Sequence, residues 1–85
     1  MKLLHFKAAW CSPCKNLSKL LENVKFPYER QIIDIDEDIE TALIYNVRSV
    51  PMLILINDDN DIIQSHKGML TLSELKNKFF DIVGE

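Results

Sequence analysis

Trp10-Cys11-Ser12-Pro13-Cys14 is the stretch that decides how this chain folds and what it does. It follows an apolar run and opens an amphipathic helical pattern. One thiol is therefore expected at the tip of a helix and the other one turn further along. A pair in this arrangement can close into a disulfide and reopen by thiol–disulfide exchange. These are the only two cysteines of the chain, so no other thiol competes as a partner.

Length and composition are those of a small globular protein. The 85 residues predict one domain, residues 1–85, with a single core. A hydrophobic content of 47% is too high for a disordered chain. No apolar run is long enough to span a membrane, and no signal-peptide pattern opens the chain. We therefore expect a cytoplasmic monomer in a reducing environment, without membrane association.

Charge is unevenly distributed along the sequence. Residues 1–28 carry five lysines against Glu22 alone, whereas residues 29–61 carry nine carboxylates against Arg30 and Arg48. Such runs usually form a solvated surface; the alternative is that the lysines also favour the thiolate of Cys11. Because no basic stripe with interleaved aromatic residues is present, nucleic-acid binding is not expected.

The pattern of apolar residues predicts the element order β-α-β-α-β-β-α. The first helix is expected to start at the cysteine pair, to have about three turns and to end before Pro27, and Asp36 is expected to cap a short second helix. Thr71-Leu72-Ser73-Glu74 has capping-box spacing and predicts the start of the third. The first two strands are expected to be parallel, and the last two antiparallel. The predicted strands cover residues 2–8, 28–35, 52–56 and 61–67.

Helical spacing also predicts which side chains face the core. Cys14 shares the apolar stripe of the first helix, whereas Cys11 lies outside this stripe at the N-terminal tip. Asn46 is expected to close the second helix in a left-handed conformation. The predicted inward positions of the second helix are Ile39, Ala42 and Leu43. Those of the third are Leu72, Leu75, Phe79, Ile82 and Val83.

In these motifs the chain resembles the thioredoxin family over essentially its whole length. The matching pieces are residues 10–15, Arg48-Ser49-Val50-Pro51 and Lys67-Gly68, in the family's order. The resemblance implies an α/β protein with a minimal thioredoxin fold, a four-stranded mixed sheet with three helices. It also implies that the Val50–Pro51 bond is cis, that Pro51 faces the disulfide, and that Gly68 lines the groove for the substrate chain.

The chain departs from the family pattern at several positions. The family's extra strand and helix before the first strand here have no counterpart, so the sheet is expected to be of glutaredoxin size. Ser12 stands where the family usually has glycine. His5 replaces the family's buried acid, Lys7 replaces an aromatic residue, and Ile32 stands at the position of a lysine. The family's apparatus for proton transfer is therefore not simply inherited.

The residues suggest a division of roles between the two thiols. Cys11 is expected to attack a substrate disulfide, and Cys14 to resolve the mixed disulfide that forms. Two alternatives are a zinc site that uses His5 or His66, for which no second CxxC or paired-histidine motif exists, and an inert bridge. An inert bridge across four residues removes little chain entropy. No metal is expected.

Other residues are candidates for substrate binding or proton transfer. Trp10, Ser12 and Pro13 are expected beside the disulfide, although Trp10 is also consistent with ordinary surface packing. Pro13 is tolerated early in a helix. The backbone of Val50 is expected to pair with an extended substrate segment. His5 is either the proton acceptor for Cys14 or a core histidine with a satisfied hydrogen bond.

The expected function is the reduction of protein disulfides. No bound cofactor is expected, and a flavin-dependent, NADPH-linked thioredoxin reductase would supply the electrons. Ribonucleotide reductase is a candidate client by analogy alone. One alternative is a glutaredoxin-type enzyme recharged by glutathione, although glutaredoxins carry a Gly-Gly pair followed by an acidic residue, and here Met69 follows Gly68. Another is a non-catalytic subunit that stabilises a partner enzyme.

Overall fold

A four-stranded mixed sheet forms the middle layer of the protein, and the computed structural model describes residues 1–80 of the chain. The strands are β1 (Lys2–Lys7), β2 (Glu29–Asp34), β3 (Met52–Ile56) and β4 (Ile62–Lys67). They lie in the order β2-β1-β3-β4. β1 pairs in parallel with β2 and antiparallel with β3, and β3 pairs antiparallel with β4. The predicted mixed sheet and its strand directions are therefore confirmed.

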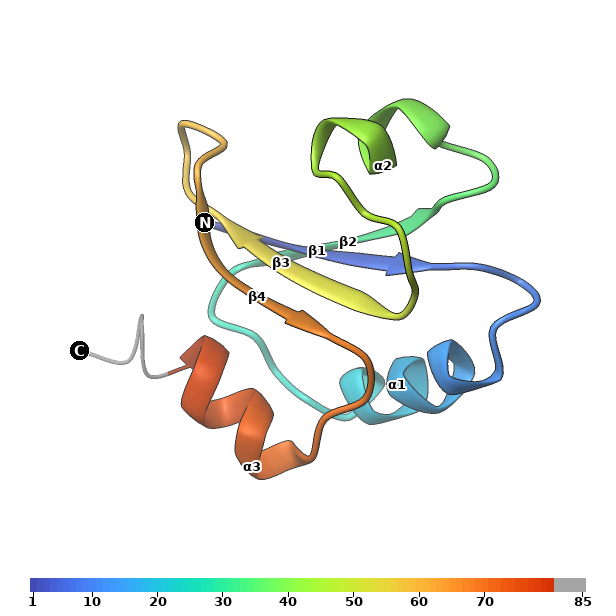
Figure 1. The fold of residues 1–85 in the computed structure, drawn as a ribbon. Helices are drawn as coiled ribbons and strands as arrows, with labels where there is room; N and C mark the ends of the chain where they lie inside the picture. Colours follow the sequence, from blue (N-terminus) through green and yellow to red (C-terminus); the bar gives the residue numbers. More distant parts are fainter. Residues whose placement is uncertain (81–85) are drawn as a thin grey trace.

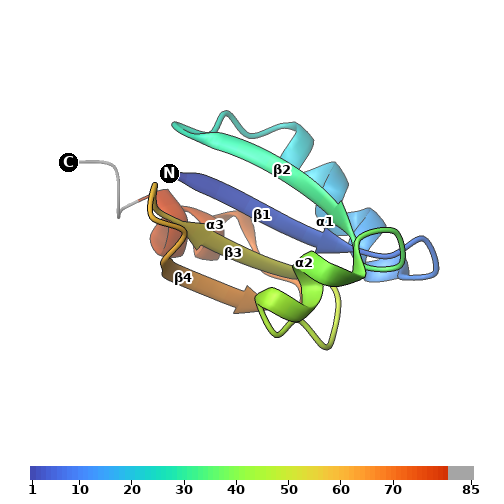
Figure 2. The ribbon, with the colours of Figure 1, turned by 90° about the horizontal axis from the view of Figure 1, so that it is seen from above.

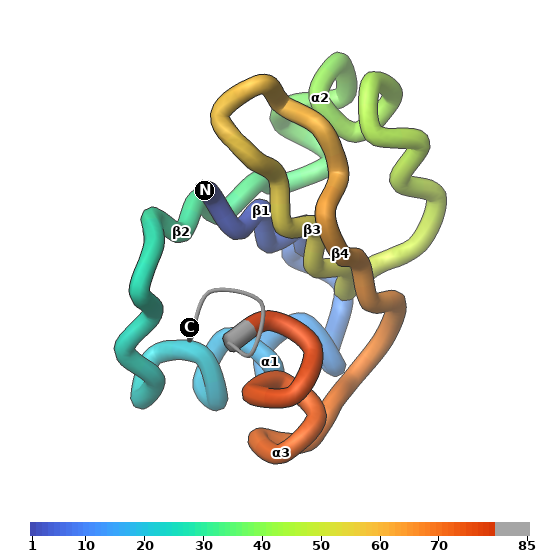
Figure 3. Tube along the Cα trace, turned by 90° about the vertical axis from the view of Figure 1, so that its left-hand side faces the viewer, coloured from blue at the N-terminus to red at the C-terminus, as the bar shows by residue number. Residues whose placement is uncertain are grey.

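Helices cover both faces of this sheet, but unequally. They are α1 (Ser12–Glu22), α2 (Ile39–Ile44) and α3 (Leu72–Leu75), and α3 continues as the π-helical turn η1 (Lys76–Phe80). α1 and α3 lie on one face, and the short α2 lies alone on the other (Figure 1). The end-on view in Figure 3 shows the same layers. Within the described residues, no helix is long and apolar enough to cross a membrane.

The core consists of two apolar clusters, one on each face of the sheet. The cluster beneath α1 and α3 is formed by Leu3, Leu17, Leu21, Leu53, Leu55, Leu70, Leu75 and Phe79. The cluster beneath α2 is formed by Leu4, Phe6, Ile33, Ala42, Val47, Met52, Ile54 and Ile56. The strand β3 contributes to both clusters because all five of its residues are buried, as its continuously apolar sequence predicts.

Local capping explains where two of the helices begin. Cys11 is the N-cap of α1, and Pro13 lies in the first turn, where its missing N–H leaves no helical bond unmade. At α3 the predicted capping box is present. The Thr71 hydroxyl accepts a 3.1 Å hydrogen bond from the Glu74 N–H, and the Glu74 carboxylate accepts one of 3.0 Å from the Thr71 N–H. The bond that the Thr71 N–H donates to the carboxylate favours its charged form and lowers the pKa of Glu74.

The structure corrects the sequence-based prediction for α2. Its N-cap is Asp38, whose carboxylate accepts a 3.1 Å hydrogen bond from the Thr41 N–H, and not Asp36. Of the three predicted inward positions only Ala42 is buried, whereas Ile39 and Leu43 are 60% and 73% exposed. A helix of six residues is less than two turns long, so its apolar spacing does not define one face. Asn46 has a φ of 56°, as predicted.

The last helix also differs from its predicted pattern. Leu75 and Phe79 are buried as expected, but Leu72 in the first turn is partly exposed, and Leu70 before the helix is buried instead. The predicted inward residues Ile82 and Val83 lie outside the residues that the structure describes. α3 itself has four residues, about one turn, so apolar spacing does not define which face of it is buried.

Candidate redox site

Cys11 and Cys14 form a disulfide at the end of the sheet where β1 runs into α1. Their Cα atoms are 5.3 Å apart, which is within the range that disulfides require. The Cys11 N–H donates a 3.1 Å hydrogen bond to the Ala8 carbonyl and thereby closes the turn between β1 and α1. The predicted pairing of the two cysteines is confirmed.

The N-terminus of α1 is built to stabilise a negative charge on Cys11. Its sulfur accepts a 3.1 Å hydrogen bond from the Cys14 backbone N–H. The first turn of the helix contains no acidic residue that would oppose an anion there. In the reduced state the same N–H and the helix dipole act on the Cys11 thiolate, and both favour the charged form.

Both cysteines are buried in the closed pair. They pack with Ala8, Ile35 and Val50 at the edge of the core. Cys11 retains slightly more exposure than Cys14, 4% against 1%. The helical spacing correctly predicted that Cys14 faces the core. Cys11 lies at the helix tip, as predicted, but in the disulfide its side chain is less exposed than a residue at a helix tip usually is.

The loop before β3 reaches the disulfide through Val50. The Val50–Pro51 peptide bond is cis, as the family resemblance implied. The Gly68 N–H donates a 2.8 Å hydrogen bond to the Pro51 carbonyl, so the end of β4 is tied to this loop. Gly68 has a φ of +83°, a conformation that L-residues rarely adopt, although a Cβ there would meet no atom within 4 Å. The structure thus brings Val50, Pro51 and Gly68 to the same end of the sheet as the cysteines.

Trp10 stands beside the disulfide and is held by Asp36, the residue that was expected to cap the second helix. Its side chain is 67% exposed, and its indole Nε1 donates a 2.9 Å hydrogen bond to Oδ2 of Asp36. Ser12 and Pro13 are exposed next to it. The missed contact had a signal in the sequence. Parallel neighbouring strands end at the same edge of a sheet, so the acidic turn after β2 must lie beside the turn after β1.

His5 is fully buried on the face of β1 that α1 covers. It shares this face with Leu3, two residues earlier, which packs in the cluster beneath α1 and α3, and it pairs in register with Ile32 of β2. Neither ring nitrogen has a hydrogen-bond partner within residues 1–80. Burial, and then the positive charges of Arg30 and Lys7, lower the pKa of His5 to about 4. The imidazole is therefore neutral at pH 7.

An open hollow that both cationic and anionic side chains line lies beside Cys14. Its volume is about 360 Å³, and its charged lining residues are Lys7, Lys15, Lys19 and Glu22. The Lys7 ammonium also lies 3.6 Å from Oδ2 of Asp34. Three lysines of the first third of the chain therefore line the same hollow as Cys14, opposed by one carboxylate.

The geometry of His66 bears on the zinc alternative. His66 Nε2 lies 3.0 Å from the Met69 carbonyl and its Nδ1 lies 2.9 Å from the Lys78 ammonium, so both nitrogens have partners. His5 is enclosed in the core. Within the described residues, no group of three or more histidine, cysteine, aspartate and glutamate side chains is placed to hold a metal ion.

Known proteins with this pattern are thioredoxins. The thioredoxin family model matches residues 1–80. A thioredoxin of Buchnera aphidicola subsp. Acyrthosiphon pisum is 36% identical over 83 residues, which are 93% of this chain and 75% of that protein. A solved mutant thioredoxin from Halobacterium salinarum NRC-1 has a TM-score of 0.81 and 32% identity, over 89% of this chain and 68% of that one. Thioredoxin 1 from Thermosipho africanus TCF52B shares the fold over 100% of both chains, with a TM-score of 0.83 and 23% identity.

A buried disulfide at a helix N-terminus, facing a cis-proline loop on a four-stranded mixed sheet, defines a dithiol–disulfide oxidoreductase. The matches to curated and solved thioredoxins agree with this class. The chain belongs to the thioredoxin family, and its redox-active pair is Cys11 and Cys14.

Proposed function

We propose that this chain reduces disulfides of other proteins as a cytoplasmic monomer and is recharged by an NADPH-linked thioredoxin reductase. The observation that carries the proposal is the position of Cys11 as the N-cap of α1, packed against Val50 of the cis-proline loop. An extended substrate segment next to that loop would present its own sulfur to Cys11. The candidate client ribonucleotide reductase is proposed by analogy alone.

The first step is attack by the Cys11 thiolate on one sulfur of a substrate disulfide. A bond forms between Cys11 Sγ and that sulfur, the substrate S–S bond breaks, and the other substrate sulfur leaves as a thiolate. The N–H of Cys14, which points at Cys11 Sγ in the closed pair, supports the thiolate before attack.

The second step resolves the mixed disulfide. Cys14 Sγ loses its proton and attacks Cys11 Sγ, the bond from Cys11 to the substrate breaks, and the two electrons of the dithiol are left on the reduced substrate. Lys15 and Lys19 line the hollow beside Cys14 and favour its thiolate. The product is the Cys11–Cys14 disulfide that the structure contains.

His5 is proposed as the transient acceptor of the Cys14 proton. It is neutral, enclosed on the α1 side of the sheet, and has two unpaired ring nitrogens within residues 1–80. With the His5 pKa at about 4, transfer from an ordinary thiol of pKa 8.5 is uphill by about 6 kcal/mol. Turnover at about 10 per second tolerates a total barrier of about 16 kcal/mol, so this uphill transfer is compatible with turnover.

Substrate binding is proposed to use the surface around the disulfide. The exposed residues Trp10, Ser12 and Pro13 are proposed to form one side of it, and Val50, the buried Pro51 and Gly68 the other. The backbone of Val50 is the proposed pairing partner of an extended substrate segment, in the manner of strand addition.

The mechanism is tested with a matched pair of single substitutions. Cys14→Ser should accumulate a mixed disulfide with an oxidised protein substrate, detected by mass spectrometry, because nothing resolves it. Cys11→Ser should accumulate none through Cys14. If both variants trap substrate equally, the assigned roles are wrong. If the double variant keeps full biological activity, the thiols are incidental and the chain acts as a non-catalytic binding subunit.

The electron donor is decided by turnover with each recharging system. We expect NADPH with thioredoxin reductase to sustain reduction of insulin disulfides, and glutathione with glutathione reductase to sustain at most about a tenth of that rate. The reverse ratio would establish the glutaredoxin-type alternative.

The role of His5 is tested by substitution. His5→Ala should slow resolution, and His5→Asp, which restores an acid at this position, should recover part of the rate with a changed pH profile.

A further inference from the structure

The strand β2 forms one margin of the sheet. It is the first strand in the order β2-β1-β3-β4, so among residues 1–80 only β1 pairs with it. Figure 2 shows β2 along one side of the sheet and β4 along the other. The outer side of an edge strand carries N–H and C=O groups to which another extended segment can bind. The outer side of β2 is therefore a candidate surface for strand pairing.

One hydrogen bond fixes the direction of the backbone groups along β2. The Ile35 N–H donates a 2.9 Å hydrogen bond to the Lys7 carbonyl, so Ile35 directs its backbone groups towards β1. Because these groups alternate in direction along a strand, those of Gln31 and Ile33 also face β1. The residues whose backbone groups face the open side are Arg30, Ile32 and Asp34.

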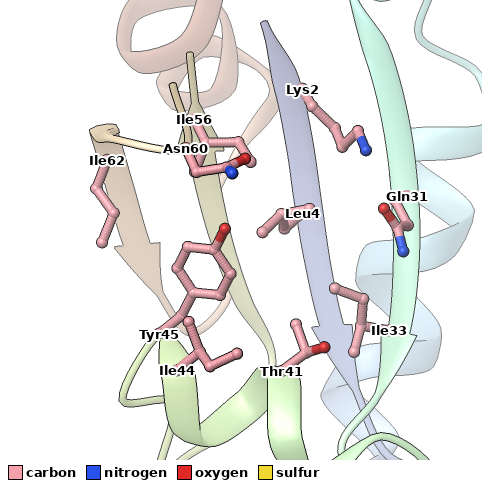
Figure 4. Close-up of a pocket in the computed structure, with 10 residues that line it drawn as sticks. All are labelled: Lys2, Leu4, Gln31, Ile33, Thr41, Ile44, Tyr45, Ile56, Asn60 and Ile62. Carbon is pink, nitrogen blue, oxygen red and sulfur yellow. The ribbon is translucent and has the colours of Figure 1, made fainter. Parts of the chain in front are cut away.

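The side chains of these three residues share one face of the sheet. Gln31 and Ile33 point to the other face, where they line the open groove beside α2 (Figure 4). Ile32 pairs in register with His5, whose side chain lies on the α1 face. Since side chains alternate between the two faces of a strand, the row on the α1 face consists of Arg30, Ile32 and Asp34.

This row is apolar in the middle and oppositely charged at its two ends. Ile32 at the centre is 50% exposed. The Arg30 guanidinium lies 5.8 Å from the centroid of the Phe26 ring, and within residues 1–80 no carboxylate is within ion-pair distance of it. Asp34 at the other end lies 3.6 Å from the Lys7 ammonium. A row in the order cation, apolar residue, anion is complementary to the same row in reverse.

A two-fold axis supplies this reversal. Two identical edges related by such an axis meet in antiparallel orientation. With the axis at Ile32, the two Ile32 side chains lie opposite each other, and each Arg30 lies opposite Asp34 of the other copy. The two Ile32 residues then exchange N–H···O bonds in both directions, and each Asp34 N–H donates to the Arg30 carbonyl opposite it. The Asp34 carbonyl is not needed, because it already accepts a 2.8 Å hydrogen bond from the Asp38 N–H.

Other registers of the same two edges are less favourable. A shift of two residues places Ile32 opposite Arg30 or Asp34, so neither the apolar pair nor the Arg30–Asp34 pairs form. A shift of four residues places two Arg30 or two Asp34 side chains opposite each other, and like charges in that position are destabilising. The register with Ile32 at the axis is therefore the preferred one.

The opposite margin of the sheet is less suited to pairing. The register of β4 against β3 shifts between the pairs Leu55–Gln64 and Ile56–Ile62, so the ladder is irregular there. Irregularities of this kind interrupt an edge and hinder the addition of another strand. β2 pairs with β1 without any shift over its whole length.

We propose that two copies of this chain associate through their β2 edges, antiparallel and with Ile32 at the two-fold axis. The contact is short, so the association is weak and reversible, with an expected Kd of about 0.1 to 1 mM. The single chain of the proposed function therefore predominates in dilute solution and remains the unit that exchanges disulfides. Antiparallel pairing places the two cysteine pairs at opposite ends of the joined sheet, so both stay open to substrate.

The pairing is tested first by the solvent exchange of backbone amides, measured by NMR on the 85-residue chain. Between about 0.05 and 2 mM protein, the exchange of the Ile32 and Asp34 N–H groups should slow at least about twofold. The Ile33 and Ile35 N–H groups are internal controls, because they already bond within the sheet. Their exchange rates should not depend on the protein concentration.

Two substitutions at the axis test the register. Ile32→Lys and Ile32→Glu each bring like charges together, so each variant alone should have a Kd at least about tenfold above that of the parent. An equimolar mixture of the two brings opposite charges together and should return the Kd to within about threefold of the parent. Rotational correlation times from ¹⁵N relaxation measure these changes.

Ile62→Lys is the matched control on the other edge strand, where Ile62 is 54% exposed. It should change the Kd less than about twofold. Amide shifts of β3 that match those of the parent show that each variant is folded.

Three results would overturn the proposal. The first is that amide exchange and tumbling stay constant up to the highest concentration. The second is an equal effect of Ile62→Lys and Ile32→Lys, because the contact then lies on another surface. The third is a mixture of the two Ile32 variants that associates no better than either alone, because Ile32 then does not face its own copy.

Discussion

The indole Nε1 of Trp10 donates a 2.9 Å hydrogen bond to the Asp36 carboxylate, across the ends of two parallel strands. Trp10 follows β1 and Asp36 follows β2. At the ends of these strands the Ile35 N–H donates a 2.9 Å hydrogen bond to the Lys7 carbonyl. The exposed indole beside the redox pair is therefore fixed by a residue 26 positions away.

We expect Asp36→Ala to loosen Trp10 and to raise the KM for a protein disulfide about fivefold, as the loss of about 1 kcal/mol predicts. Asp36→Asn retains an acceptor oxygen and should change KM less than Asp36→Ala. Steady-state kinetics with insulin and the fluorescence anisotropy of Trp10 measure both effects. Trp10 is the only tryptophan, so the signal has one source. Equal KM values for Asp36→Ala and the parent would show that the hydrogen bond does not position the indole for substrate.

The two thiols should differ in reactivity once the disulfide is reduced. Cys11 is at the helix tip, and its sulfur accepts a hydrogen bond from the Cys14 N–H, whereas the Cys14 side chain is almost fully buried. We expect iodoacetamide at pH 7 to modify Cys11 at least about tenfold faster than Cys14, because the thiolate is the reactive form. Peptide mass spectrometry separates the two sites. Modification at equal rates contradicts the assigned roles.

His5 should make the protein less stable in acid. Its pKa is about 4 in the folded state against 6.5 for an ordinary imidazole, so the unfolded chain binds more protons between these values. The contribution of neutral His5 is complete above pH 6.5 and is lost as the pH falls towards 4. The total over this window is about 3 kcal/mol, at about 1.36 kcal/mol for each pKa unit.

Urea unfolding at pH 7.0, 5.5 and 4.5 measures this loss. We expect His5→Leu to flatten the pH dependence, because leucine keeps an apolar side chain at the buried position and removes the titrating group. His66→Gln is the matched control, since it removes the other imidazole. Its free energy of unfolding should change with pH as that of the parent does. If the change of stability with pH disappears in His66→Gln and persists in His5→Leu, His5 is not its source.

The tautomer of His66 follows from its two partners. The Lys78 ammonium can only donate, so Nδ1 accepts, and Nε2 carries the proton that it donates to the Met69 carbonyl. The ¹⁵N shifts of the ring should therefore show the Nε2–H form at neutral pH. Lys78→Met should remove the preference and lower the free energy of unfolding by about 1 kcal/mol. Averaged ring shifts in the parent would show that Lys78 does not fix the tautomer.

Local sequence signals predicted the redox pair, the capping box at Thr71 and Glu74, and the left-handed Asn46. Each of these depends on residues within a few positions of one another, where spacing along the chain determines geometry. The same reasoning was wrong for Asp36, which bonds Trp10 and does not cap a helix. Asp36 has two competing uses in the sequence, and only the adjacency of β1 and β2 selects between them.

The sequence by itself determined the order of the elements, the parallel pairing of β1 with β2, the antiparallel pairing of β3 with β4, and the identity of the two thiols. Backbone propensity and the separation of Cys11 and Cys14 are properties of the chain itself. Only the tertiary structure decided that Gly68 bonds Pro51, that His5 is buried without a partner within residues 1–80, and that Ile44 and Ile62 border an open groove. These outcomes depend on strand register and on which layer covers each face of the sheet. They arise when distant segments compete for the same contacts, and local spacing carries no information about that competition.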